Sequence, residues 1–337
     1  MLNRFRIFFV PLIPALISLF LTLSLGSCAR PKTTKLRVFG LPFLGNAPFF
    51  IAEEEGYFAE QNIEVELVRM DDLARAIPAL IKGDLDVILG DLRVATLNAV
   101  ALGGTIRIVA GISNLGSTQT GSMVLIGTSA FTETLDDPEQ LRGRHIATSK
   151  MSIAEYYLEK VLSAVGLTPS DVVLRHDIPI TVRHENLEKG AVDLISVGEP
   201  WCTRALSAGN TAVWMPGSKV IPGMQLGILM YGPKLLNENP DAGRKFMTSY
   251  LKAMRQYNKG KTPRNLEIMI GYTGLDPELL KKTTWPAVPN DGKLNVESIM
   301  DFQTWALEKE YLKDPVTEDQ LMDYSFIEYA NQTLGKP

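Results

Sequence analysis

Cysteine and histidine are scarce in this chain of 337 residues. There are two cysteines and three histidines, His145, His176 and His184. The spacings H-E-x-x-H, C-x-x-C and G-x-S-x-G, which carry metal and nucleophile chemistry, do not occur. The sequence therefore predicts no metal, no cofactor and no enzyme activity. An acid–base pair of His176 with Asp177 is the catalytic alternative, although an aspartate beside a histidine more often serves a turn.

Excess positive charge is also lacking. The net charge is −4 and no basic stripe occurs, which argues against a nucleic-acid partner. Apart from the run over residues 7–25, no apolar stretch is long enough to span a bilayer. The composition is ordinary for a globular protein, and the length predicts two domains. We expect a soluble monomeric body.

The N-terminus has the order of a lipoprotein signal. Two arginines precede an apolar run over residues 7–25, and small residues then lead to Cys28. This ending matches the lipobox pattern of bacterial lipoproteins. It predicts a signal peptide over residues 1–27, a lipid on Cys28 and a tether over residues 28–34. A retained anchor helix is the alternative, which two prolines within the run disfavour.

Cys202 is then left without a disulfide partner. We expect it to be an inert buried thiol. A Cys28–Cys202 bridge is the alternative in an extracytoplasmic protein, but it would pin the tether to the interior of the chain.

From Lys35 onward, short β-rich runs alternate with amphipathic helical patterns, which is typical of βαβ units and parallel sheets. Strands are predicted at residues 36–41, 63–68, 87–89, 106–110, 144–148, 172–174 and 192–197. Helices are predicted at residues 49–55, 73–81, 92–102, 152–164, 183–189, 242–256, 265–270, 277–281, 296–309 and 318–330. Asp71 and Asp72 are predicted to cap one helix, and Ser152 with Glu155 forms a capping box at another.

The pattern restarts after Pro138, which indicates a second lobe inserted into the first. Crossover strands are predicted near Ser122–Ile126 and Met224–Leu229. Residues 35–121 and 226–337 would form lobe 1, and residues 122–225 would form lobe 2. Such an arrangement predicts a ligand cleft between the lobes, where the strand ends meet, and a hinge motion that closes it.

Several segments carry a resemblance to a known family. They are Ala47–Phe58, Ile81–Asp91, Leu141–Ala147, Gly166–Val172, Gly190–Asp193 and Gly198–Trp201. In this order they resemble the periplasmic substrate-binding proteins of ABC importers, in the nitrate, sulfonate, taurine and thiamine-precursor group. The resemblance implies a two-lobed type II binding-protein fold, an extracytoplasmic location at the cell membrane, and a permease with its ATPase as partners.

The ligand candidates are loop residues at predicted strand ends, where a rigid scaffold aims side chains into the cleft. In the first lobe they are Phe43, Asn46, Asp91, Ser113 and Asn114. In the second lobe and at the hinge they are Ser149, Met151, Ser152, His176, Glu199, Trp201 and Gln225.

The aromatic rings of Phe43 and Trp201, with nearby amide groups, favour a flat heteroaromatic ligand held by stacking and hydrogen bonds. Among the resembling proteins this implies a vitamin, either riboflavin or a thiamine-precursor pyrimidine. Interior packing of the two rings is the alternative. An alkanesulfonate, taurine or nitrate is the other ligand class, since the turn beside Lys150 could hold an anion. A sensor subunit and, more distantly, a pyrimidine-synthase-like enzyme are the remaining functional alternatives.

Overall fold

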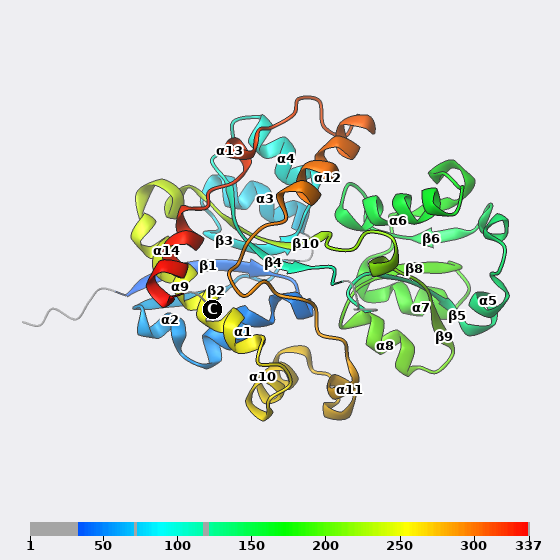
Figure 1. Ribbon diagram of the computed structural model, residues 1–337, viewed down its shortest axis with the longest axis horizontal. Coiled ribbons are helices and arrows are strands. Elements are labelled where there is room, and N and C mark those ends of the chain that lie inside the picture. Colours follow the sequence, from blue (N-terminus) through cyan, green and yellow to red (C-terminus); the bar gives the residue numbers. More distant parts are fainter. Residues whose placement is uncertain (1–32, 71–72, 117–120, 336–337) are drawn as a thin grey trace, which may run out of the picture. The chain divides into compact units, whose positions relative to one another are not determined.

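The computed structural model describes residues 33–70, 73–116 and 121–335. The predicted signal peptide, the lipid site at Cys28 and the helix cap at Asp71–Asp72 lie outside the described residues. The body from Thr33 onward contains two five-stranded sheets, in the orders β2-β1-β3-β10-β4 and β7-β6-β8-β5-β9 (Figure 1).

The first sheet consists of β1 (Thr34–Gly40), β2 (Ile63–Leu67), β3 (Val87–Asp91), β4 (Arg107–Asn114) and β10 (Gln225–Tyr231). The strands β1, β2 and β3 are parallel, whereas β10 runs antiparallel to both β3 and β4. The sheet is therefore mixed, and the late strand β10 returns the chain to a position between β3 and β4 in the sheet that the early strands began.

Helices cover both faces of the first sheet, because alternate strand residues are apolar on both sides. Val38 and Leu89 pack toward α1 (Ala47–Glu54) and α9 (Pro240–Tyr257). Phe39 and Ile88 pack toward α3 (Leu73–Lys82) and α4 (Val94–Ala101). Figure 1 shows α3 and α4 on one side of this sheet and α1 and α9 on the other. The remaining helices around it are α2 (Tyr57–Glu60), α10 (Pro263–Thr273), α11 (Pro277–Lys282), α12 (Val296–Glu308), α13 (Glu318–Leu321) and α14 (Ser325–Leu334).

The second sheet consists of β5 (Val124–Thr128), β6 (His145–Ala147), β7 (Val173–Arg175), β8 (Leu194–Val197) and β9 (Thr211–Pro216). The helices that accompany it are α5 (Ser129–Thr134), α6 (Ile153–Ala164), α7 (Arg183–Glu188) and α8 (Trp201–Ser207). Below, the first lobe means residues 33–114 and 225–335, and the second lobe means residues 124–216.

The helix α6 of the second lobe packs on α12 of the first. Tyr156 meets the rings of Phe302 and Trp305 edge-on, at centroid distances of 5.8 and 5.7 Å. The indole nitrogen of Trp305 donates a hydrogen bond of 2.9 Å to Glu159. Buried aromatic surface therefore joins the two lobes on the α6 side.

The structure differs from the sequence-based predictions in several places. The predicted helix over residues 318–330 is two helices, because the backbone of Met322 leaves the helical path to form a bridge with Ile108. The strand β9 and the helices α2, α5 and α8 were not predicted. The side chain of Glu155 does not close a box with Ser152 but accepts the backbone N–H of Met151, at 2.5 Å.

The predicted burial of Cys202 is confirmed, and burial raises the pKa of its thiol well above the ordinary value. Within residues 33–335 as described, no helix is long and apolar enough to cross a membrane. The same residues contain no cluster of His, Cys, Asp or Glu suited to hold a metal ion.

Candidate functional site

A cavity of about 100 Å³ lies where the two lobes meet. The first lobe contributes the ends of β1 and β3, the start of α1 and the β10 segment. The second lobe contributes the ends of β6 and β8 with the starts of α6 and α7. Loops at the carboxyl ends of strands thus surround the cavity from both lobes, which is where open α/β sheets bind their ligands.

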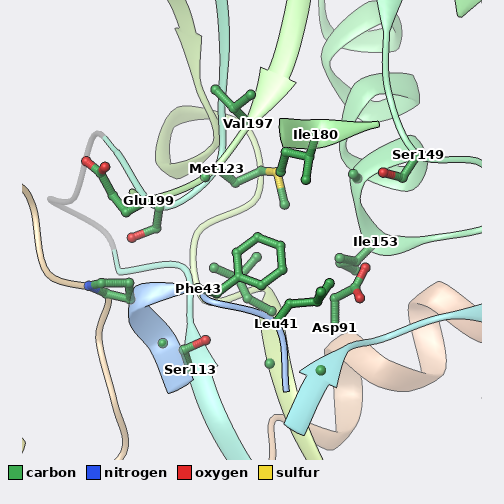
Figure 2. A pocket seen from close by; sticks show the side chains of 18 of the residues that line it. Leu41, Phe43, Asp91, Ser113, Met123, Ser149, Ile153, Ile180, Val197 and Glu199 are labelled. Atoms are coloured by element: carbon green, nitrogen blue, oxygen red, sulfur yellow. The ribbon is translucent and has the colours of Figure 1, made fainter. Parts of the chain in front are cut away.

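Most of the cavity wall is apolar. Figure 2 shows the ring of Phe43 in the middle of the site, with Leu41, Met123, Ile153 and Ile180 around it. Such a wall accepts a ligand with a hydrocarbon or aromatic portion. The few polar groups among these side chains then determine the ligand's orientation and charge.

Arg183 is the most unusual of these polar groups. Its side chain is 2% exposed and lies at the first residue of α7. The guanidinium donates hydrogen bonds to the carbonyl oxygens of Ile178 (3.1 Å) and Ser196 (2.7 Å) and to the hydroxyl of Ser149 (2.8 Å). These three acceptors are uncharged. Since a guanidinium has five N–H donors, two of them are left for a further acceptor.

Burial and, to a smaller extent, the nearby charge of Arg93 lower the pKa of Arg183 to about 10, against the opposing effect of the charge of Asp91. The guanidinium still carries its full charge at neutral pH. A buried cation whose hydrogen-bond partners are neutral is costly unless an anion compensates it. The cavity therefore has a site for negative charge.

Arg93 and Asp91 also line the cavity, and they form an ion pair with each other. The Nε of Arg93 lies 3.0 Å from the Oδ1 of Asp91, and both side chains are largely buried. Among the described residues Arg183 itself forms no ion pair with a carboxylate, although the charge of Asp91 acts on it in the opposite direction to that of Arg93.

Glu199 borders the cavity but does not offer its carboxylate to it. The carboxylate oxygens accept hydrogen bonds from the backbone N–H of Thr203 (3.0 Å) and from the Thr203 hydroxyl (2.9 Å). Figure 2 shows this carboxylate directed away from the Phe43 ring. Burial raises the pKa of Glu199 to about 7, against the opposing effect of bonds from Thr203 and Thr284 and the charge of Lys261.

A comparison with known protein families shows which family this chain belongs to. Residues 29–270 match the NMT1-like family. This chain belongs to the NMT1-like family. Among curated proteins, no sequence matches it significantly.

Solved structures share the fold of this NMT1-like protein at low sequence identity. The ligand-binding component of an ABC-type import system from Staphylococcus aureus has 17% identity and a TM-score of 0.74, covering 88% of this chain and 99% of its own. The periplasmic nitrate-binding protein NrtA from Synechocystis has 14% identity and a TM-score of 0.73, covering 91% and 90%. The aliphatic sulphonate binding protein SsuA from Escherichia coli has 14% identity and a TM-score of 0.69, covering 86% and 92%. The predicted periplasmic-binding-protein fold is confirmed.

Six residues that the sequence nominated for ligand contact lie on the cavity wall of the NMT1-like protein. They are Phe43, Asn46, Asp91, Ser113, Ser149 and Glu199. They come from five separate segments of the chain, and the fold brings them together. Their role in binding stays a prediction.

Two nominated residues lie in the protein interior behind the wall. Trp201 is 8% exposed and packs edge-on against Phe43, with the ring centroids 4.9 Å apart. Gln225 is fully buried, donates to the carbonyl oxygens of Ser113 and Gly227, and accepts from the backbone of Asn295. Both side chains hold neighbouring segments in place.

Four further nominated residues lie outside the wall. Met151 and Ser152 form part of a contact between the lobes, and Asn114 donates its backbone N–H to Ala287. The Nε2 of His176 lies 3.6 Å from Glu155. Asp177 forms an ion pair with Arg175, so its carboxylate is engaged by a residue other than His176.

Arg183 and Arg93 were missed by sequence reasoning. One signal pointed to Arg183. It occupies the first residue of a predicted helix, where the helix dipole disfavours a cation. A cation at a position where the helix dipole disfavours it indicates that the tertiary structure requires it there.

Proposed function

We propose that this protein is the substrate-binding component of an ABC-type importer and that its ligand is a small anion. The buried guanidinium of Arg183 in the interlobe cavity carries the proposal. It supplies a fixed positive charge with two unused donors, which is what a carboxylate, sulfonate or nitrate group accepts.

The rest of the cavity supports an organic ligand of modest size. Phe43, Ile180 and Met123 offer apolar contact beside the charged end. The cavity is smaller than the roughly 300–1,000 Å³ that is usual for drug-sized ligands. A compact molecule with one anionic group and a short apolar portion fits these features.

The structural neighbours support the same class. The names of two of them state a sulphonate and a nitrate as ligands, and the third is a component of an ABC-type import system. Since their identities to this chain are 14–17%, the charge of the cavity is the stronger argument.

A heteroaromatic vitamin such as riboflavin or a thiamine-precursor pyrimidine is the second candidate. The half-buried ring of Phe43 inside the cavity favours it, since such a ring can stack on a flat ligand. Two observations weigh against it. Trp201 is not part of the wall, and a neutral ring system would leave Arg183 without a counterion.

We further propose that a lipid on Cys28 holds the protein at the outer side of the cell membrane, near a permease and its ATPase. The lobes would be residues 35–121 with 226–337, and residues 122–225, moving about the crossover segments. The protein would act as a monomer and release its ligand chemically unchanged, without acting as an enzyme.

Binding of a ligand panel tests the proposal. Methanesulfonate, taurine, nitrate and riboflavin are titrated into the purified protein by calorimetry, and each bound ligand is recovered and checked for chemical change. We expect an anion to bind and to be recovered intact. Saturable binding of riboflavin with no response to any anion would contradict the proposal, and so would turnover.

Arg183→Lys provides the decisive variant, because it keeps the positive charge and loses the planar guanidinium group that can bind an anion through two hydrogen bonds. Loss of a charge-assisted hydrogen bond costs about 2 kcal/mol, or roughly 30-fold in affinity. Arg175→Gln is the matched control, since it removes an arginine of the same lobe that pairs with Asp177 at the surface. Equal effects of the two variants on affinity would exclude Arg183 as the anion site.

A further inference from the structure

A short backbone ladder joins the two lobes at the edge of the cavity. The segment Leu92–Val94 follows β3 in the first lobe, and Met151–Ile153 precedes α6 in the second. Val94 donates its N–H to the carbonyl of Met151 at 3.0 Å, and Ile153 donates to the carbonyl of Leu92 at 3.0 Å. Arg93 and Ser152 form the antiparallel bridge between these bonds. The ladder can exist only while the lobes are in contact.

The second-lobe half of the ladder is held in an unusual conformation. Met151 has φ = 54°, in the left-handed region that non-glycine residues seldom adopt. Its N–H bonds to the buried carboxylate of Glu155, which also accepts the hydroxyl of Tyr311 from the first lobe at 3.2 Å. Such strain persists where surrounding contacts impose it, and it is frequent at switch positions.

The central residue of the ladder also carries a charge into the cavity. Arg93 belongs to the first lobe and Arg183 to the second, and both side chains line the same cavity. The charge of Arg93 acts on Arg183 more strongly than the opposite charge of Asp91 does. Contact between the lobes therefore brings two like charges together, only partly screened by Asp91.

We propose that Arg93 is a specificity-determining residue that makes closure of the lobes depend on an anion. When the Leu92–Val94 ladder forms, Arg93 and Arg183 share the cavity, and a ligand with negative charge offsets their repulsion. A neutral ligand of the same shape leaves the repulsion in place and closes the lobes poorly. Specificity then arises from a repulsive element as well as an attractive one. The inference rests on the proposed anion site.

Hydrogen exchange by NMR measures the ladder directly in the full chain. The amides of Val94 and Ile153 are protected when the lobes are closed, and the amide of Leu89 in β3 serves as an internal reference for global stability. In ligand-free protein we expect Arg93→Gln to raise the protection of the two ladder amides at least about threefold, because one of two like charges is removed.

Asp91→Asn should have the opposite effect, because it increases the repulsion between Arg93 and Arg183. It leaves Arg93 without its partner, so the ladder amides should lose protection by a similar factor in ligand-free protein, and added nitrate or methanesulfonate should restore it. Arg144→Gln is the control, since it removes an exposed arginine of the second lobe and should leave the ladder unchanged. Arg93→Lys keeps the charge and should resemble the wild type.

Unchanged or reduced protection in Arg93→Gln, or raised protection in Asp91→Asn, would overturn the inference. Comparing these variants with the wild type in the absence of ligand is sufficient to test the repulsion between Arg93 and Arg183. A different outcome is that the variants behave as expected while neither nitrate nor methanesulfonate changes the protection of the ladder amides in the wild type. In that case the repulsion between Arg93 and Arg183 is supported and the proposed ligand class fails.

Discussion

The buried carboxyl group of Glu199 predicts a specific dependence of stability on pH. Its side chain is 4% exposed, and burial raises its pKa from 4.5 to about 7 in the folded protein. Between these two values the folded state holds a proton that the unfolded state has released. The contribution of Glu199 is therefore fully present below pH 4.5, declines as the pH rises, and is lost above about pH 7.

The magnitude follows from the size of the shift. A difference of 2.5 pH units at about 1.4 kcal/mol per unit gives roughly 3 kcal/mol. This is a large fraction of the free energy of unfolding of an ordinary domain, which is about 5–15 kcal/mol. Glu199→Gln abolishes the titration, so the difference in unfolding free energy between wild type and variant should change by this amount across the same interval.

Urea unfolding at closely spaced pH values from 4.5 to 8 measures this difference. Glu133→Gln, an exposed position on α5, is the control for removal of a carboxylate as such. A difference between wild type and Glu199→Gln that stays constant over this range would refute the reasoning. A difference that moves in favour of the wild type as pH rises would refute it as well.

Three further predictions concern packing and the lobe contact. Trp201→Ala should cost about 3 kcal/mol or more in urea unfolding, because the ring fills the interior behind Phe43. Lost ligand affinity at unchanged stability would instead make Trp201 a ligand contact. Tyr311→Phe should cost about 1 kcal/mol through its lost bond to Glu155, and an unchanged midpoint would contradict this. Gly292→Ala should lower the melting temperature, because Gly292 has φ = 68° and an added Cβ would collide with Ile327. Gly271→Ala, in open space within α10, should raise it slightly, and equal shifts for the two variants would exclude the steric reason.

The order of strands and helices was predictable because it depends on local patterns. Alternating apolar residues marked β2, and the apolar run Val87–Leu89 marked β3. The crossover strands also lie close to the predicted segments, since β5 begins at Val124 and β10 at Gln225. Periodicity and turn residues are properties of a few consecutive positions, so a single sequence contains them.

The charge of the site was not predictable in the same way. Sequence reasoning offered only the turn beside Lys150 for an anionic ligand and preferred stacking on Phe43 and Trp201. Arg183 becomes important only because Ser149 and Ser196, from two other segments of the chain, meet it in the interior. Trp201 faces the core because α8, which was not predicted, begins at this residue and packs its ring among Val197 and Ala205. Both outcomes depend on tertiary placement, which local patterns do not contain.

The charge of the natural ligand is the central claim, and its most direct test is the molecule that the protein itself retains. Protein purified without added ligand is compared intact by native mass spectrometry and after denaturation, and the released small molecule is identified. The account predicts one molecule per chain that carries a carboxylate, sulfonate or related anionic group and that is lost from Arg183→Lys. Release of a neutral flavin or pyrimidine from the wild type, retained equally by Arg183→Lys, would contradict it.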